Sequence, residues 1–217
     1  MYRIPRIDCN VACPASLEEA FACTVRETVA CNNWPADFPY APQVGFRIFH
    51  TGADLLLRFD VAERCTAART LDDNGPVWTD SCAEFFFRPE GSDSYYNFEC
   101  NCIGTLLVGH RRDRTQAEHA PAEVLRTVRR RATYPHAPLP ETEGDNRWTL
   151  TLAIPAAALF RDRIAGWDGV QGAMNLYKCG DDLSCPHYLS WRPVGTPAPD
   201  FHRPEFFEPV FFEPKKQ

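Results

Sequence analysis

The segment from Trp78 to Arg88 combines residue types that suit recognition of a sugar. The indole of Trp78 follows a turn-like stretch, and the carboxylate of Glu84 comes six residues later inside a run of aromatic residues. An aromatic ring stacks on the apolar face of a pyranose, and a carboxylate accepts hydrogen bonds from its hydroxyl groups. Since charged groups are rarely buried alone, Glu84 either faces a cleft or lies on the solvated face of a core strand. The residues alone leave both interpretations open.

A second carboxylate raises the alternative of catalysis. The segment Tyr95–Cys102 alternates between two faces, with Glu99 on the more polar one. That face is predicted to carry Tyr95, Asn97, Glu99 and Asn101, and the other face Tyr96, Phe98, Cys100 and Cys102. Glycoside hydrolases need two carboxylates about 5–5.5 Å or 6.5–9.5 Å apart. Glu84 and Glu99 would fit this scheme if they faced each other on neighbouring strands, which the sequence does not show.

Signals for a cofactor are weak. Met174 lies on a predicted strand and would be a haem ligand only with a facing histidine, so we expect it in the core. None of the six histidines has a ligand-like spacing; they are His50, His110, His119, His136, His187 and His202. We expect His202 to anchor its loop. The polar loop from Glu63 to Gly75 contains Asp72 and Asp73 but lacks EF-hand spacing. We therefore expect no cofactor, with calcium as the open alternative.

The chain contains ten cysteines. No Cys-x-x-Cys pair occurs, so the usual spacing of a structural zinc site is absent. A chain of this length buries a core without disulfides, and no export signal is seen. We therefore expect reduced, mostly buried thiols that pack as small apolar side chains.

Short strands separated by turn signals dominate the chain. Its 19 prolines and 15 phenylalanines favour many short β-segments over helices. The predicted strands are Cys23–Cys31, Phe46–His50, Leu55–Val61, Cys82–Arg88, Tyr95–Cys102, Thr105–His110, Val124–Thr133, Arg147–Ile154, Ala173–Cys179, His187–Val194 and Glu208–Glu213, with a loop at 135–145. About ten such strands predict an all-β fold, a two-sheet β-sandwich or jelly roll with minimal helix.

Length and charge restrict the class of protein. The 217 residues fit one domain, 1–217, in which 1–20 form an entry segment. A net charge of −6 gives no electrostatic footprint for nucleic acid. No apolar run approaches the roughly 18 residues that suggest a membrane span. The N-terminus lacks the apolar region of a signal peptide, so we expect a cytoplasmic protein, with an extracytoplasmic location left open. Partner proteins cannot be identified from these features.

Five segments, taken in order, resemble a known family. They are Trp78–Phe86, Tyr96–Asn101, Trp148–Pro155, Asn175–Asp181 and Ser190–Trp191. Together they resemble a family 9-like carbohydrate-binding module of the DOMON superfamily, over residues 20 to 213.

The resemblance implies a non-catalytic β-sandwich that binds a saccharide, with haem binding, which some DOMON relatives show, as an alternative. In such modules two tryptophans hold a terminal sugar ring between them, and polar side chains bind its hydroxyl groups. Trp78 and Glu84 match the first tryptophan and the acid, and Trp191 is the best match for the second tryptophan. The further polar partners that the resemblance suggests, on strands expected to border the same cleft, are Asn97, Asn101 and Lys178.

Overall fold

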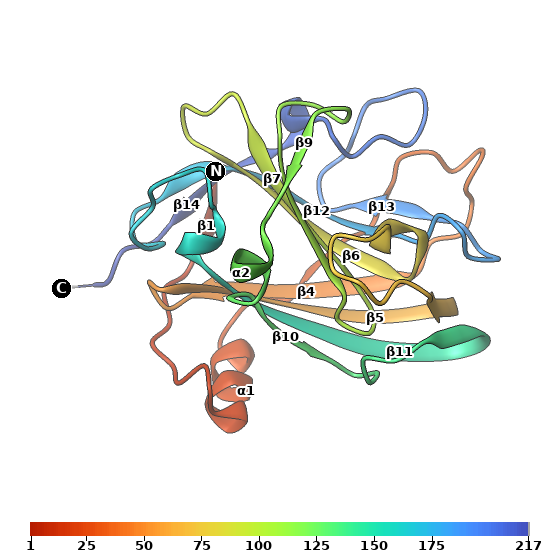
Figure 1. The fold of residues 1–217 in the computed structure, drawn as a ribbon, viewed down its shortest axis with the longest axis horizontal. Coiled ribbons are helices and arrows are strands. Elements are labelled where there is room, and N and C mark those ends of the chain that lie inside the picture. Colours follow the sequence, from red (N-terminus) through yellow and green to blue (C-terminus); the bar gives the residue numbers. More distant parts are fainter. Residues whose placement is uncertain (217) are drawn as a thin grey trace.

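Two β-sheets packed face to face form the body of the computed structural model, which describes residues 1–216 (Figure 1). The larger sheet has the order β1 (Tyr2–Ile4), β14 (Glu208–Phe212), β12 (Gln171–Cys179), β6 (Cys82–Pro89), β7 (Tyr95–Asn101), β8 (Leu106–Arg111) and β9 (Ala117–His119), and β13 (Tyr188–Ser190) pairs with β12 and with β3 (Cys31–Asn32). The smaller sheet has the order β10 (Arg129–Ala132), β11 (Leu139–Pro155), β5 (Asp54–Ala68), β4 (Gln43–His50) and β2 (Glu27–Thr28). The predicted two-sheet sandwich is confirmed.

Helices are short in this fold. Helix α1 (Pro14–Ala22) lies on the outer face of the smaller sheet, where Phe21 packs edge-on against Phe49 of β4 (Figure 1). The others are α2 (Ala122–Leu125) and the 3₁₀ turns η1 (Val77–Thr79), η2 (Ala156–Ala158) and η3 (Pro204–Phe206). No helix within residues 1–216 combines the length and apolar character needed to cross a membrane.

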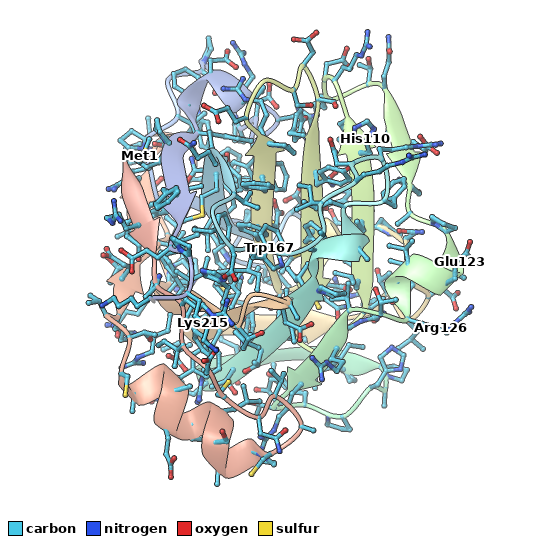
Figure 2. The ribbon with its side chains drawn as sticks, turned by 90° about the vertical axis from the view of Figure 1, so that its left-hand side faces the viewer. Met1, His110, Glu123, Arg126, Trp167 and Lys215 are labelled. Atoms are coloured by element: carbon cyan, nitrogen blue, oxygen red, sulfur yellow. A yellow bond between two sulfur atoms is a disulfide. The ribbon has the colours of Figure 1, made fainter. Side chains whose placement is uncertain are left out.

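Alternation along the strands divides the larger sheet into two faces. In β6, Phe85 and Phe87 point into the core between the sheets, whereas Phe86 packs in a second apolar cluster on the outer face. Trp167 lies fully buried in the inter-sheet core, stacked on Phe212 (Figure 2). In β11, Trp148, Leu150, Leu152 and Ile154 alternate with outward residues and face this core. Phe38 and Phe201, from loops outside the sheet, pack on this outer face.

Two predicted segments differ in the structure. Residues 135–145 were expected to be a loop, yet β11 begins at Leu139 and pairs with β5 through two register shifts. These shifts break the regular alternation that a sequence pattern needs, although the pairing itself persists. The predicted strand Val124–Thr133 begins as helix α2 and becomes β10 only at Arg129. The entry segment also contributes strand β1, which runs parallel to β14.

The expectation of reduced thiols is wrong for one pair. Cys65 on β5 is bonded to Cys185, which lies 120 residues away in the loop between β12 and β13. The fold brings these two residues together, and their separation in sequence gives no signal of it. The remaining eight cysteines are free: Cys9, Cys13, Cys23, Cys31, Cys82, Cys100, Cys102 and Cys179.

Candidate binding pocket

A pocket of about 450 Å³ opens on the outer face of the larger sheet. This volume falls in the range of sites that bind small molecules. Strands β6, β7 and β12 supply its floor, and the segments around Phe38, Trp78 and Asp200 supply its walls. The residues that line it are Phe38, Trp78, Glu84, Glu99, Arg111, Arg114, Cys179, Asp181, Tyr188, Pro199, Asp200, Phe201 and His202.

The floor of the pocket is fixed by strand register. Glu84 of β6 lies directly opposite Glu99 of β7 and opposite Tyr177 of β12. Cys82 lies opposite Cys179, one step along the same face. Because these residues belong to adjacent antiparallel strands, their side chains converge on one small area. Glu84 and Glu99 are each only 3% exposed, so the pocket ends on two buried carboxyl groups.

Burial determines the protonation of these two acids. Burial raises the pKa of Glu84 well above its usual value, and repulsion from Glu99 adds to the effect. Burial likewise raises the pKa of Glu99 to about 7. Two hydrogen bonds act in the opposite direction: Cys179 Sγ donates to Glu84 Oε1 (2.9 Å), and Asn97 Nδ2 donates to Glu99 Oε1 (2.7 Å). A protonated carboxyl group both donates and accepts hydrogen bonds, so the floor offers both functions to a ligand.

Trp78 presents an exposed aromatic face beside this floor. It lies on η1 and is 39% exposed, which is unusual for so large an apolar side chain. Its carbonyl accepts a hydrogen bond from the backbone N–H of Asp181 (3.2 Å). The turn is anchored by buried Asp80, whose carboxylate accepts from the backbone N–H groups of Arg69 and Thr70. The backbone of Trp78 is therefore fixed by these hydrogen bonds, while its indole ring remains exposed.

Aromatic residues that the sequence analysis missed form another wall. Phe38 packs edge-on against Tyr188, with ring centroids 4.6 Å apart. Phe201 stacks on Tyr177 at 4.2 Å, and Tyr188 lies 6.2 Å from Phe201. They come from segments far apart in the chain, so no local pattern predicts their meeting. The site combines one exposed indole with a separate aromatic wall.

Basic groups border the same pocket. Arg111 Nε donates to Asn97 Oδ1 (3.0 Å), and its Nη1 donates to the carbonyl of Arg114 (2.9 Å). His202 makes a hydrogen bond through Nδ1 with the hydroxyl of Tyr95 (2.9 Å). Burial lowers the pKa of His202 to about 3, so the imidazole is neutral. This contact supports the expected loop-anchoring role of His202, although the residue also lines the pocket.

Asn97 and Asn101 do not line the pocket but contact residues next to it. Both are fully buried on the face predicted for them. Asn97 connects Arg111 to Glu99, as described above. Asn101 Nδ2 donates to Asp80 Oδ2 (3.0 Å) and therefore supports the turn that carries Trp78. Their side chains position pocket residues.

Lys178 points away from the pocket, which corrects its expected place. Its neighbours in β12, Tyr177 and Cys179, face outward, so strand alternation turns Lys178 into the space between the sheets. There its Nζ lies 2.8 Å from Glu63 Oε2 of β5 and 2.7 Å from His187 Nε2. This buried network connects the two sheets.

The structure also corrects the expected position of Trp191. It is 4% exposed and packs edge-on against Tyr2 (5.0 Å) and Phe46 (5.7 Å) in the inter-sheet core. The chain leaves β13 at Ser190, and the backbone N–H of Trp191 donates to the carbonyl of Leu176 (2.8 Å), which directs the indole inward. Trp191 does not line the pocket that contains Trp78. The expected pair of facing tryptophans is therefore not formed.

Met174 and Asp73, which were considered as ligands of haem and of calcium, contact other protein groups. Met174 is fully buried in the inter-sheet core, as expected. Asp73 is paired with Arg130 (2.7 Å) and accepts from the backbone N–H of Leu106 (3.0 Å). Its carboxylate is thus engaged, and calcium at that loop stays an untested alternative. A different group, Cys82, Glu84 and Cys179, brings three metal-ligating atoms within 4.8 Å of one another.

Comparison with known proteins identifies the family. The family model for carbohydrate-binding family 9 matches residues 14–212. The chain belongs to carbohydrate-binding family 9. This family 9 protein is 39% identical to a solved protein from Bacteroides uniformis, provisionally described as carbohydrate-binding, with a TM-score of 0.91 over 97% of this chain and 98% of that one. The resemblance found in the sequence is confirmed.

More distant structures share only the fold. A family 9 module from Caldicellulosiruptor kristjanssonii in complex with glucose is 8% identical, with a TM-score of 0.60 over 99% of this chain and 97% of that one. A family 9 module from the same organism in complex with cellotriose is also 8% identical, with a TM-score of 0.57 over 99% of this chain and 94% of that one. No curated protein matches the chain.

Proposed function

We propose that this family 9 protein binds a mono- or oligosaccharide end in the pocket, without catalysing a reaction. One observation carries the proposal: the exposed ring of Trp78 borders a pocket whose floor holds two buried carboxyl groups, Glu84 and Glu99. The indole would stack on the apolar face of a pyranose, and the carboxyl groups would bind its hydroxyl groups. Membership in a carbohydrate-binding family supports the same function.

The remaining apolar surface would come from Phe38 and Tyr188 instead of Trp191. Phe38 and Tyr188 form an edge-on aromatic pair that lines the pocket. A ring bound at Trp78 would gain further apolar contact there. Trp191 is in the core, so we assign it a structural role.

Selectivity would come from the buried polar groups. A buried donor or acceptor left unpaired costs about 1–3 kcal/mol. A sugar whose hydroxyl groups pair with Glu84 and Glu99 would therefore bind better than one that leaves either of them unpaired. The family 9 modules from C. kristjanssonii are in complex with glucose and cellotriose, so glucose and short glucans are the first ligands to test.

A thermal-shift screen followed by calorimetry tests this proposal. Mono- and disaccharides would be added to the wild-type protein and to Trp78→Ala, with and without calcium. We expect stabilisation that grows with ligand concentration and disappears in the variant. Equal binding by wild type and Trp78→Ala would refute the assigned site.

Glycoside hydrolysis is the second candidate, because Glu84 and Glu99 lie directly opposite one another. Cross-strand neighbours of this kind have Cβ atoms about 4.5–5.5 Å apart. That spacing is compatible with the carboxylate separation of about 5–5.5 Å in retaining hydrolases. Turnover of an aryl glycoside that vanished in both Glu84→Gln and Glu99→Gln would establish it. We expect no turnover by the wild-type protein.

A further inference from the structure

We propose that Cys82, Cys179 and Glu84 form a site for a thiolate-preferring divalent cation such as Zn²⁺ at the floor of the pocket. Two Sγ atoms and one carboxylate oxygen lie within 4.8 Å of one another there. Cys179 Sγ is already 2.9 Å from Glu84 Oε1. This site shares Glu84 with the proposed sugar pocket, but its three ligands are in place without a sugar.

The backbone holds the three ligands in a rigid arrangement. Cys82 and Cys179 are direct partners in the antiparallel register of β6 and β12. Glu84 lies two residues beyond Cys82, so its side chain emerges from the same face of β6. Both strands lie inside the larger sheet, with hydrogen-bonded neighbours on either side. Sites built on such strands keep their geometry better than sites built on loops.

The ligand types decide the class of cation. Thiolates favour zinc and similar metals over calcium and magnesium, which prefer oxygen ligands. Zinc is usually four-coordinate, with sulfur at about 2.3 Å, and many of its sites combine three protein ligands with one open position. Glu84 and Cys179 both line the pocket, so the open position would face it. A water molecule or a sugar hydroxyl would fill that position.

Loading the site exchanges protons for the cation. Zinc binds cysteine as the thiolate and glutamate as the carboxylate. The thiol protons of Cys82 and Cys179 and the carboxyl proton of Glu84 therefore leave to solvent when the two Zn–S bonds and the Zn–O bond form. No oxidant or reductant takes part in this step. Both thiols are buried, at 0% and 2% exposure, so the two sulfur ligands are shielded from bulk water.

Cobalt titration of the reduced, sugar-free protein tests the proposal. We expect one equivalent of Co²⁺ to bind, with a thiolate-to-cobalt charge-transfer band that Zn²⁺ then removes. Cys82→Ser and Cys179→Ser should each lose the band. Cys100→Ser is the matched control, since Cys100 is buried in the same sheet but faces the inter-sheet core. Cys23→Ser controls for an exposed thiol. Both controls should keep the band.

X-ray absorption of the zinc-loaded wild type provides a test that needs no variant. Two sulfur ligands per zinc, at about 2.3 Å, are expected. The proposal is overturned if reduced wild type binds neither metal, if the band survives in Cys82→Ser, or if zinc has no sulfur ligand. A Cys82–Cys179 disulfide that resists reduction would also overturn it. None of these results bears on sugar binding, which is measured separately.

Discussion

Glu84 and Glu99 face each other across strands β6 and β7 and close the floor of the pocket on the outer side of the larger sheet. Each is buried, and each is held by a neighbour: Glu84 by the thiol of Cys179 and Glu99 by the amide of Asn97. Such a pair is costly to bury without a ligand that uses its hydrogen-bonding capacity. Together with the exposed indole of Trp78, it is the reason for assigning sugar binding to this pocket.

Replacing Glu99 by Gln should weaken sugar binding while leaving the fold intact. Gln keeps the shape and one oxygen for Asn97 but removes one acceptor from the floor. Above its pKa of about 7 Glu99 is ionised, and a hydrogen bond to a charged group is worth about 1.5–3 kcal/mol. We therefore expect the dissociation constant measured above that pH to rise at least about tenfold. Calorimetry with the best sugar from the screen measures this. Glu123→Gln, on the exposed part of α2, should bind like wild type; equal loss in both variants would contradict the role of Glu99.

Lys178→Met should lower the free energy of unfolding without changing any residue that lines the pocket. Lys178 is fully buried and pairs with Glu63 (2.8 Å), and removing one partner leaves an unpaired buried charge. The expected loss in the free energy of unfolding is about 3–5 kcal/mol, measured by urea denaturation. The double variant Lys178→Met with Glu63→Gln should recover part of that loss, because no charge is then left alone. A double variant less stable than Lys178→Met would contradict the pairing.

The stability of the fold should depend on pH through His187. Burial and the charge of Lys178 lower the pKa of His187 from 6.5 to about 3, although Glu63 and a backbone hydrogen bond with Cys185 act in the opposite direction. Tyr40 packs edge-on against the same ring. Between pH 6.5 and pH 3 the imidazole of His187 is therefore protonated in the unfolded chain but neutral in the folded one. Its contribution to the free energy of unfolding is complete above pH 6.5 and is lost as the pH drops towards 3.

Urea titrations at several pH values measure this contribution. His187 alone should contribute about 1.4 kcal/mol per pH unit within that window. Comparison with His187→Gln isolates it, since the variant should show a shallower dependence. His136→Gln is the control, because His136 is exposed. The account of His187 fails if both variants retain the wild-type slope.

Local patterns predicted the fold and the centre of the pocket. The alternation of Tyr95–Cys102 gave the correct faces of β7, and the Trp78–Glu84 motif gave two residues that line the pocket. The faces of β7 were predicted correctly because period-2 alternation shows directly which side chains share a face. The early part of β11 was missed because its register shifts interrupt that period.

The rest of the site depends on long-range contacts. Alternation assigns Lys178 and Cys179 to opposite faces but does not say which face bears the pocket, so Lys178 was misplaced. Trp191 follows a three-residue strand, too short for a pattern to show its direction. Arg111, Tyr188 and His202 reach the pocket through loops and pairings between distant segments. Only the assembled sheets reveal these contacts.

Parallel calorimetric titration of wild type, Trp78→Ala and Trp191→Phe with the same sugar tests the central claim most directly. Trp78 is 39% exposed in the pocket, whereas Trp191 is 4% exposed in the core. We predict that Trp78→Ala abolishes measurable binding, while Trp191→Phe loses stability but keeps the wild-type dissociation constant. Binding that survives in Trp78→Ala and is lost in a folded Trp191→Phe would contradict the account.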